Sequence, residues 1–165
     1  MTAPDFFAAY LMNHILGGGT FTSRLFDEVR EKRGLAYSVF SGLSAYHDAG
    51  NLTIYAGCAN DAVEEVVDLT LAELRDLREK MVPADELQRA KDHLKGSLML
   101  SLENTASRMS HLARQEIYFD RQFGLDETLI GISRVACDLF ANGSLAATVL
   151  GPTAPDLQKA RLDLG

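Results

Sequence analysis

The sequence has no tryptophan, two cysteines and no long apolar run. Cys58 and Cys137 lack the spacing of paired metal ligands, so buried free thiols are their expected state. A membrane-spanning helix needs about 18 consecutive apolar residues, and no segment approaches that length. The first residues also lack the basic and then apolar pattern of a signal peptide, although a targeting segment upstream of residue 1 would not be visible here. We therefore expect a soluble domain.

Histidine is also scarce, and its four copies are too far apart for a helical metal site. The H-x-x-E-H motif needs two histidines one helical turn apart with a glutamate beside the second. His14, His47, His93 and His111 have no second histidine within five residues, and the nearest imitation is His111 with Glu116. A lone histidine on a helix is usually a packed or surface side chain. We predict no metal site within this chain.

Positive charge is the minority, because 16 Lys and Arg residues face 23 Asp and Glu residues, which gives a net charge of −7. This balance argues against nucleic-acid binding, since phosphates require a basic surface. The exception is a local basic run of Arg24, Arg30, Lys32 and Arg33. It would suit an acidic substrate or the carbonyl end of a peptide, or it forms a solvated helix face. The solvated face is favoured for Lys32 and Arg33.

What the sequence does contain is enough apolar residues for one core: 47% of 165 residues are hydrophobic. Helical spacing and strict alternation divide this single domain into helices and a hairpin. Helices are predicted at residues 4–18, 24–30 and 63–80, with a longer helical pattern over 84–119 that breaks near 103–104, and the antiparallel hairpin at 35–46 and 51–59.

Helix caps are predicted at three places. Thr20 or Thr22 would cap the helix that follows the glycine run, and Asp61 with Glu64 forms a capping-box pattern. Asp126 would open a further helix that ends near residue 140. An apolar run at 144–150 then fits a strand. Helices interspersed with hairpins predict an α+β fold, with helices packed on one face of a mainly antiparallel sheet.

The glycine run at Gly17, Gly18 and Gly19 has two interpretations. A tight turn with close backbone packing is favoured, and contact with a substrate backbone is the alternative. Phosphate binding is excluded by the spacing, because neither G-x-x-x-x-G-K-[ST] nor G-x-G-x-x-G is present.

Arg30 and Tyr37 stand out as a pair of hydrogen-bond donors. Arg30 ends a predicted helix, and Tyr37 follows seven residues later in an alternating stretch, so both side chains could face one groove. Two fixed donors would suit a peptide carbonyl. The alternative is an ion pair of Arg30 with Asp27 or Glu31 beside a half-buried tyrosine.

The segment GGGTFTSRLFDEVREKRGLAYSV, residues 17–39, closely resembles the second half of pitrilysin/insulinase-family zinc metallopeptidases. The most similar members are short bacterial proteins related to mitochondrial processing peptidase. The resemblance continues through DAVEEVVDLTLAELRDL and ELQRAKDHLKGSLMLSLENTASRMSHLARQEIYF to ISRV and AATVLGP. It covers nearly all of residues 5–152.

The resemblance implies a division of labour between two halves. In this family the first half carries zinc on an H-x-x-E-H helix, and the second half is a similar fold without metal that closes over the substrate. The second half contributes an arginine and a tyrosine, which match Arg30 and Tyr37 by motif. This chain would then hold no catalytic residues, with zinc in a partner half on the same polypeptide or a separate subunit. Glycine-rich segments of related processing peptidases suggest substrate-backbone contact for Gly17, Gly18 and Gly19.

The resemblance also sets expectations for domains and assembly. Residues 1–152 would form the second-half domain without its first strand, and residues 153–165 a tail. The unpaired sheet edge makes a homo-oligomer or an added strand a further hypothesis. Bacterial cytoplasm and periplasm both stay open as compartments. The rival function is a metal-free structural or protein-interaction module of the same fold, as in the core subunits of respiratory complexes.

Overall fold

The computed structural model describes residues 3–46 and 49–124 of the chain. The predicted helix from Asp126, the predicted strand at 144–150, the tail at 153–165 and Cys137 lie outside the described residues. Within them the elements follow the predicted order. They are α1 (Ala3–Asn13), η1 (His14–Gly18), η2 (Thr20–Thr22), η3 (Phe26–Glu31), β1 (Ala36–Ala45), β2 (Gly50–Cys58), η4 (Asn60–Ala62), α2 (Val63–Glu79), α3 (Ala84–Ser101) and α4 (Thr105–Phe119).

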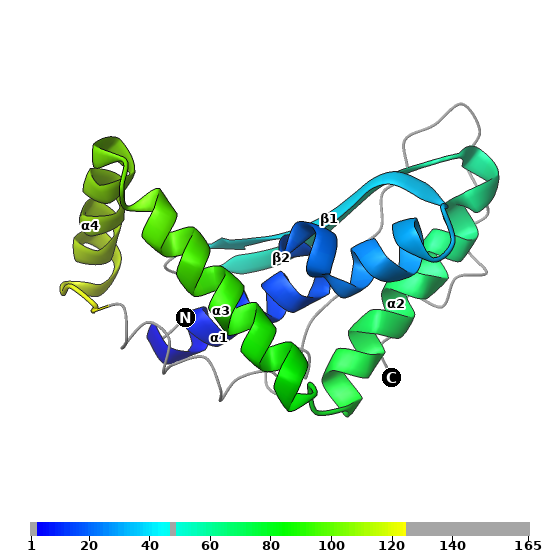
Figure 1. Cartoon of the computed structure of the whole chain (residues 1–165), viewed down its shortest axis with the longest axis horizontal. Helices are drawn as coiled ribbons and strands as arrows, with labels where there is room; N and C mark the ends of the chain where they lie inside the picture. The colour runs from blue at the N-terminus through cyan, green and yellow to red at the C-terminus, as the bar shows by residue number, and fades with distance from the viewer. Residues whose placement is uncertain (1–2, 47–48, 125–165) are drawn as a thin grey trace.

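The arrangement is mostly helical around one small sheet, in which β1 and β2 pair antiparallel. In Figure 1, α2 and α3 meet at a short loop, and α4 lies beyond the far end of α3. The predicted α+β fold is confirmed. So is the division of the long helical pattern into two helices, because Asn104 caps α4 by accepting hydrogen bonds from the N–H groups of Ala106 and Ser107.

The core lies between the hairpin and the helices on one of its faces. Val39 and Ser41 of β1 are buried against the helices, whereas Phe40 and Tyr55 stack on the opposite face with ring centroids 5.1 Å apart. This alternation is what a half-buried strand pair requires. The buried cluster consists of Leu11, Met12, Ile15, Leu16, Leu25, Phe26, Val29, Ala36, Val39, Val66, Leu74, Leu77 and Ala90.

The glycine run brings η1 directly onto β1. A Cβ atom at Gly17 would lie 2.6 Å from the backbone nitrogen of Ser41 and 2.7 Å from its hydroxyl oxygen. The Ser41 hydroxyl in turn donates a hydrogen bond to the carbonyl of Asn13 at 3.2 Å. Glycine at position 17 is therefore required by close backbone packing, which agrees with the favoured interpretation of the run.

Arg24, at the start of the next helix, ties three elements together. Its Nε and Nη2 atoms each donate a hydrogen bond of 2.8 Å to the carboxylate of Glu86 on α3. Glu73 and Asp76 of α2 lie 3.7 and 3.9 Å from its Nη1 atom. The hydrogen bonds to Glu86 raise the pKa of Arg24. Burial raises the pKa of Glu73, and Arg24 opposes that rise.

Two predicted caps are wrong. The Thr22 hydroxyl donates backward to the carbonyl of Gly19, and Thr20 has a left-handed φ of 52°, so neither threonine caps the helix. Extended Ser23 precedes the helix instead, and its carbonyl accepts the hydrogen bond of the Asp27 N–H. At α2 the N-cap is Ala62 without a side-chain hydrogen bond, because the turn η4 occupies the place of the expected capping box at Asp61.

Substituting Gly17 with alanine should destabilise the chain. The added methyl group would collide with the Ser41 backbone, which cannot rotate away as a side chain can, so we expect a loss of about 1–3 kcal/mol. Gly42→Ala is the matched control, because a Cβ atom there meets nothing within 4 Å. Urea denaturation of both variants tests the contact. Equal midpoints for Gly17→Ala and the unaltered chain would contradict it.

Candidate functional site

Arg30 and Tyr37 are positioned by a wide helical turn and a glycine. In η3 the Lys32 N–H bonds the Asp27 carbonyl five residues back, which is π-helical geometry. Gly34 then ends the helix with a φ of 65°, a conformation that glycine adopts without steric cost. The chain reverses there and enters β1. This sharp exit places Tyr37 of the strand beside the last helical turn.

The Arg30 guanidinium lies against two aromatic rings. Its Cζ atom is 4.7 Å from the ring centroid of Phe26, four residues earlier on the helix, and 5.8 Å from that of Tyr37. Both distances fall within the range of cation–π attraction. Tyr37 is 87% exposed. The two predicted donors therefore lie together at the surface.

The alternative interpretation of Arg30 as an ion-pair partner does not match the geometry. No carboxylate among the described residues lies within ion-pair distance of Arg30. Asp27 instead contacts Lys32, with the ammonium nitrogen 2.8 Å from a carboxylate oxygen. Glu31 is exposed and outside these pairs. Tyr37 is also far more exposed than the expected half-buried tyrosine.

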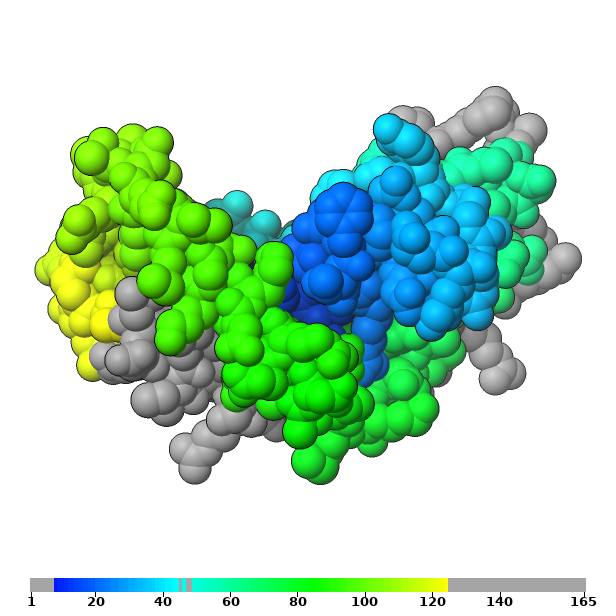
Figure 2. Space-filling model, viewed as in Figure 1, coloured from blue at the N-terminus to red at the C-terminus, as the bar shows by residue number. Residues whose placement is uncertain are grey.

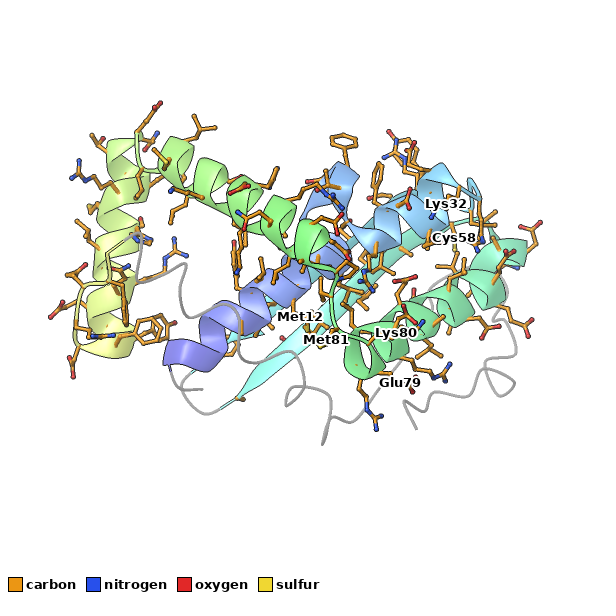
Figure 3. The ribbon with its side chains drawn as sticks, turned by 60° about the horizontal axis from the view of Figure 1, so that its bottom comes forward. Met12, Lys32, Cys58, Glu79, Lys80 and Met81 are labelled. Atoms are coloured by element: carbon orange, nitrogen blue, oxygen red, sulfur yellow. The ribbon has the colours of Figure 1, made fainter. Side chains whose placement is uncertain are left out.

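Lys32 and Arg33 form the solvated face that the sequence favoured. Lys32 pairs with Asp27 and Glu28, and Arg33 pairs with Glu28. Asp27 and Glu28 raise the pKa of Lys32, while Lys32 and Arg33 lower the pKa of Glu28. Lys32 lies at the outer end of the helix in Figure 3. Lys32 and Arg33 are thus both paired with carboxylates of their own segment.

The three glycines differ in what they can contact. Gly17 and Gly19 are buried, and the Gly19 N–H is used internally, donating to the His14 carbonyl at 2.8 Å. Gly18 is exposed. Of the three, Gly18 has the backbone most accessible to another molecule.

His14 and His93 form an unforeseen contact between η1 and α3. Their ring centroids are 4.8 Å apart with an interplanar angle of 32°. His14 is only 7% exposed, and its Nε2 atom has no hydrogen-bond partner among the described residues. Burial, with a smaller contribution from His93, lowers the pKa of His14 to about 4.

The described residues offer no ligand set that fits zinc. No group of three or more His, Cys, Asp or Glu side chains gathers there in a way that could hold a metal ion. The rings of His14 and His93 form a tilted pair with centroids 4.8 Å apart, and two histidines alone do not supply the four ligands that zinc takes. His111, the nearest imitation of the motif, contacts Gln115, and Glu116 accepts a hydrogen bond from Gln122.

Phe26 is the residue at this site that sequence reasoning missed. The helix predicted at residues 24–30 includes Phe26 but indicates no contact with Arg30. The available signal was its spacing of four residues from Arg30, which places two side chains on one helix face. Arg24 and its acidic partners could not be foreseen, because Glu86 is 62 residues away in the chain.

Comparison with known proteins adds sequence relatives. Residues 1–94 match the family model described as the peptidase M16 inactive domain. The chain is 40% identical over 125 residues to the uncharacterized zinc protease YmxG of Bacillus subtilis. It is 41% identical over 128 residues to the uncharacterized zinc protease SCO5738 of Streptomyces coelicolor. These matches cover 76% and 78% of this chain but 30% and 28% of those proteins.

Solved structures show the same fold. A peptidase M16 inactive domain from Pseudomonas fluorescens is 31% identical with a TM-score of 0.70, over 80% of this chain and 31% of that one. A chain of complex III from Candida albicans has a TM-score of 0.66 over 80% of this chain and 33% of its own. Its identity of 21% makes it evidence of fold alone.

The chain belongs to the peptidase M16 family, as an inactive, C-terminal domain of these zinc proteases. This confirms the resemblance drawn from residues 17–39 and the segments after them. The chain spans about 30% of the length of the curated relatives it matches. In residues 3–46 and 49–124, no helix has the length and apolar character needed to cross a membrane.

Acid should destabilise the chain through His14. A base whose pKa is lower in the folded than in the unfolded chain takes up a proton on unfolding. Stability is therefore full above the unfolded pKa of 6.5 and falls as the pH drops toward 4. Between about pH 7.5 and pH 5 this group alone should cost about 2 kcal/mol. Urea denaturation at the two pH values measures the loss.

His14→Phe keeps an aromatic ring against His93 and removes the titration. Between about pH 7.5 and pH 5, His14→Phe should therefore lose less stability than the unaltered chain, and the difference should be most of the roughly 2 kcal/mol attributed to His14. Met12→Leu, a non-titrating change in the same core (Figure 3), is the control and should keep the pH dependence of the unaltered chain. An identical pH dependence for His14→Phe and the unaltered chain would remove His14 as the cause.

Proposed function

We propose that this chain closes over a peptide substrate and helps to hold it while the zinc-bearing half of the enzyme cleaves it. One observation carries the proposal: an arginine without a carboxylate partner in the described residues sits beside a tyrosine that is 87% exposed. Surface arginines with acidic neighbours usually pair with them, as Arg33 does with Glu28. Arg30 instead keeps its N–H donors available for a ligand.

The chemistry that these two residues can supply is hydrogen-bond donation. As water adds to a peptide carbonyl, its oxygen gains negative charge, and donors already in place stabilise that charge without reorganising. Arg30 presents several N–H groups in a rigid fork, and Tyr37 presents one O–H group. Either donor would serve the attacked carbonyl or one beside it in the substrate backbone. Arg30 and Tyr37 are thus assigned substrate binding and transition-state support.

The glycine run has a secondary place in this proposal. Gly17 is explained by its packing on Ser41, and the Gly19 N–H is occupied by His14. Exposed Gly18 is the candidate for contact with a substrate backbone. Substrate contact is proposed for Gly18 before the other two.

Zinc belongs to the partner half in this proposal, because the residues described here do not fit it. The sequence supports this assignment, since it lacks two histidines at helical spacing. Zinc content and cleavage of a quenched peptide should be measured on this chain, on an H-x-x-E-H half, and on their mixture, after desalting. Chelator-sensitive cleavage only in samples that contain the H-x-x-E-H half is expected. Stoichiometric zinc with cleavage by this chain alone would overturn the assignment.

The rival function is a metal-free structural or protein-interaction module of the same fold. A structural module has no need for an exposed Arg30 and Tyr37 in contact. If this chain binds an H-x-x-E-H half without raising its peptide cleavage, the structural function is favoured.

Tyr37→Phe in the assembled enzyme should lower kcat more than it raises KM. The hydroxyl would act mainly on charge that develops during the reaction, and loss of one such donor typically costs about 100- to 1,000-fold in rate. Tyr55→Phe makes the same change on the adjacent strand and should leave kcat unaltered. Steady-state kinetics with a quenched peptide measures both. Equal kcat for Tyr37→Phe and the unaltered enzyme would contradict the role.

Arg30→Gln should reduce kcat/KM for the same peptide, because the cationic fork is lost. Arg33→Gln is the matched control: Arg33 lies three residues along and is already paired with Glu28. Similar losses in the two variants would point to a general effect of surface charge instead of a contact made by Arg30.

A further inference from the structure

Phe21 is an aromatic side chain held at the surface by an unfavourable backbone. It is 74% exposed, in the short turn η2 that links the glycine run to the helix of Arg30. The preceding residue, Thr20, has a φ of 52°. A β-branched residue in this left-handed region is a genuine outlier. Figure 2 shows the blue segment that contains this turn standing out from the surface near α3.

The turn is fixed by hydrogen bonds that the neighbouring hydroxyl groups supply. The Thr22 hydroxyl donates to the Gly19 carbonyl at 3.1 Å, and the Ser23 hydroxyl donates to the Thr20 carbonyl at 2.8 Å. The Ser23 N–H also bonds the Thr20 carbonyl, at 3.2 Å. Strained backbone that is held in place in this way concentrates at sites of ligand contact. Its effect here is to keep Phe21 outside the core.

Phe21 is in contact with the ring that supports Arg30. The Phe21 and Phe26 rings meet edge to face, with centroids 5.1 Å apart and an interplanar angle of 78°. The same Phe26 ring carries the Arg30 guanidinium at 4.7 Å. The buried Phe26 ring therefore contacts both the exposed Phe21 ring and Arg30, which has no carboxylate partner in the described residues.

We propose that Phe21 contacts a large apolar side chain of the peptide substrate and makes this half of the enzyme selective for such peptides. The inference rests on the proposed function of Arg30 and Tyr37. A peptide whose carbonyl is held by Arg30 presents its neighbouring side chains within a few ångströms, because an extended chain advances about 3.3 Å per residue. Phe21 is the exposed apolar group joined to Arg30 through Phe26. A large aliphatic or aromatic side chain of the peptide would pack on the Phe21 ring and remove it from water.

The test uses this chain assembled with its zinc-bearing half and two sets of quenched peptides. The two sets are identical except at one varied position, which is moved in turn through the residues around the cleaved bond. The first set carries leucine or phenylalanine at that position, and the second set carries serine. Phe21→Ser should lower kcat/KM about tenfold for peptides with the apolar residue at one position, the size expected for a lost apolar contact. Serine peptides should change less than about twofold on the same reasoning. Phe21→Leu should retain most of the preference.

Met81→Ser is the matched control, because Met81 is 93% exposed and lies in the loop between α2 and α3 (Figure 3). It should change neither set. Three results would overturn the proposal. An equal loss with both sets would mean that Phe21 supports assembly of the two halves. No loss with either set, or the same selectivity change in Met81→Ser, would mean that Phe21 makes no substrate contact.

Failure of this inference is distinguishable from failure of the proposed function. Tyr37→Phe, assayed beside Phe21→Ser, should lower kcat for both peptide sets. If it does so while Phe21→Ser leaves the preference unchanged, only the role of Phe21 is lost. If Tyr37→Phe has no effect, the proposed function itself fails.

Discussion

The approach of the Gly17 backbone to Ser41 is the constraint on which the arrangement of this domain depends. It fixes how closely η1 approaches β1, at a distance that leaves no room for a side chain at position 17. Everything that follows is placed relative to that contact: the turn at Thr20, the helix of Arg30 and the return into β1. The strand that accepts the glycine at Ser41 also carries Tyr37, so one strand links the packing contact to the candidate site.

Arg24 and Arg30 lie on one helix but have different surroundings. Arg24 directs its guanidinium into a cluster of carboxylates from α2 and α3, where its charge joins elements distant in the chain. Breaking such a half-buried pair leaves unpaired carboxylates behind, which is more costly than losing a surface contact. Arg30, six residues later, lies against the rings of Phe26 and Tyr37 and has no carboxylate partner in the described residues. Arg24 joins elements of the scaffold, and Arg30 is the arginine that we propose for ligand binding.

Helices and strands, which have a periodic residue pattern, could be predicted from the sequence. Contacts between residues far apart in the chain could not. Helical spacing placed α2, and alternation placed the hairpin, because burial of one face imposes those periods directly. The pair Arg30 and Tyr37 came from motif resemblance together with a short separation. Glu86 as partner of Arg24, and His93 as partner of His14, depend on how α3 crosses the domain, which no local pattern encodes.

The failed caps have a related cause. Thr20 and Thr22 are favourable capping residues, yet the glycine run sets the path of the chain before it reaches them, and tertiary packing outweighs a preference worth about 1 kcal/mol. Sequence rules assume unstrained backbone, so a left-handed threonine is hidden from them. The turn that carries Phe21 could not be foreseen for this reason, because Thr20 has a left-handed φ of 52°.

The ion pairs of Lys32 and Arg33 within their own segment weaken the long-range attraction of this surface for an acidic peptide. Their positive charges are offset by Asp27 and Glu28 at close range, and the whole chain carries −7. At physiological salt, charge effects fade within about 8 Å. An acidic peptide would thus gain little acceleration from a distance. Recognition here is left to forces that act only after contact.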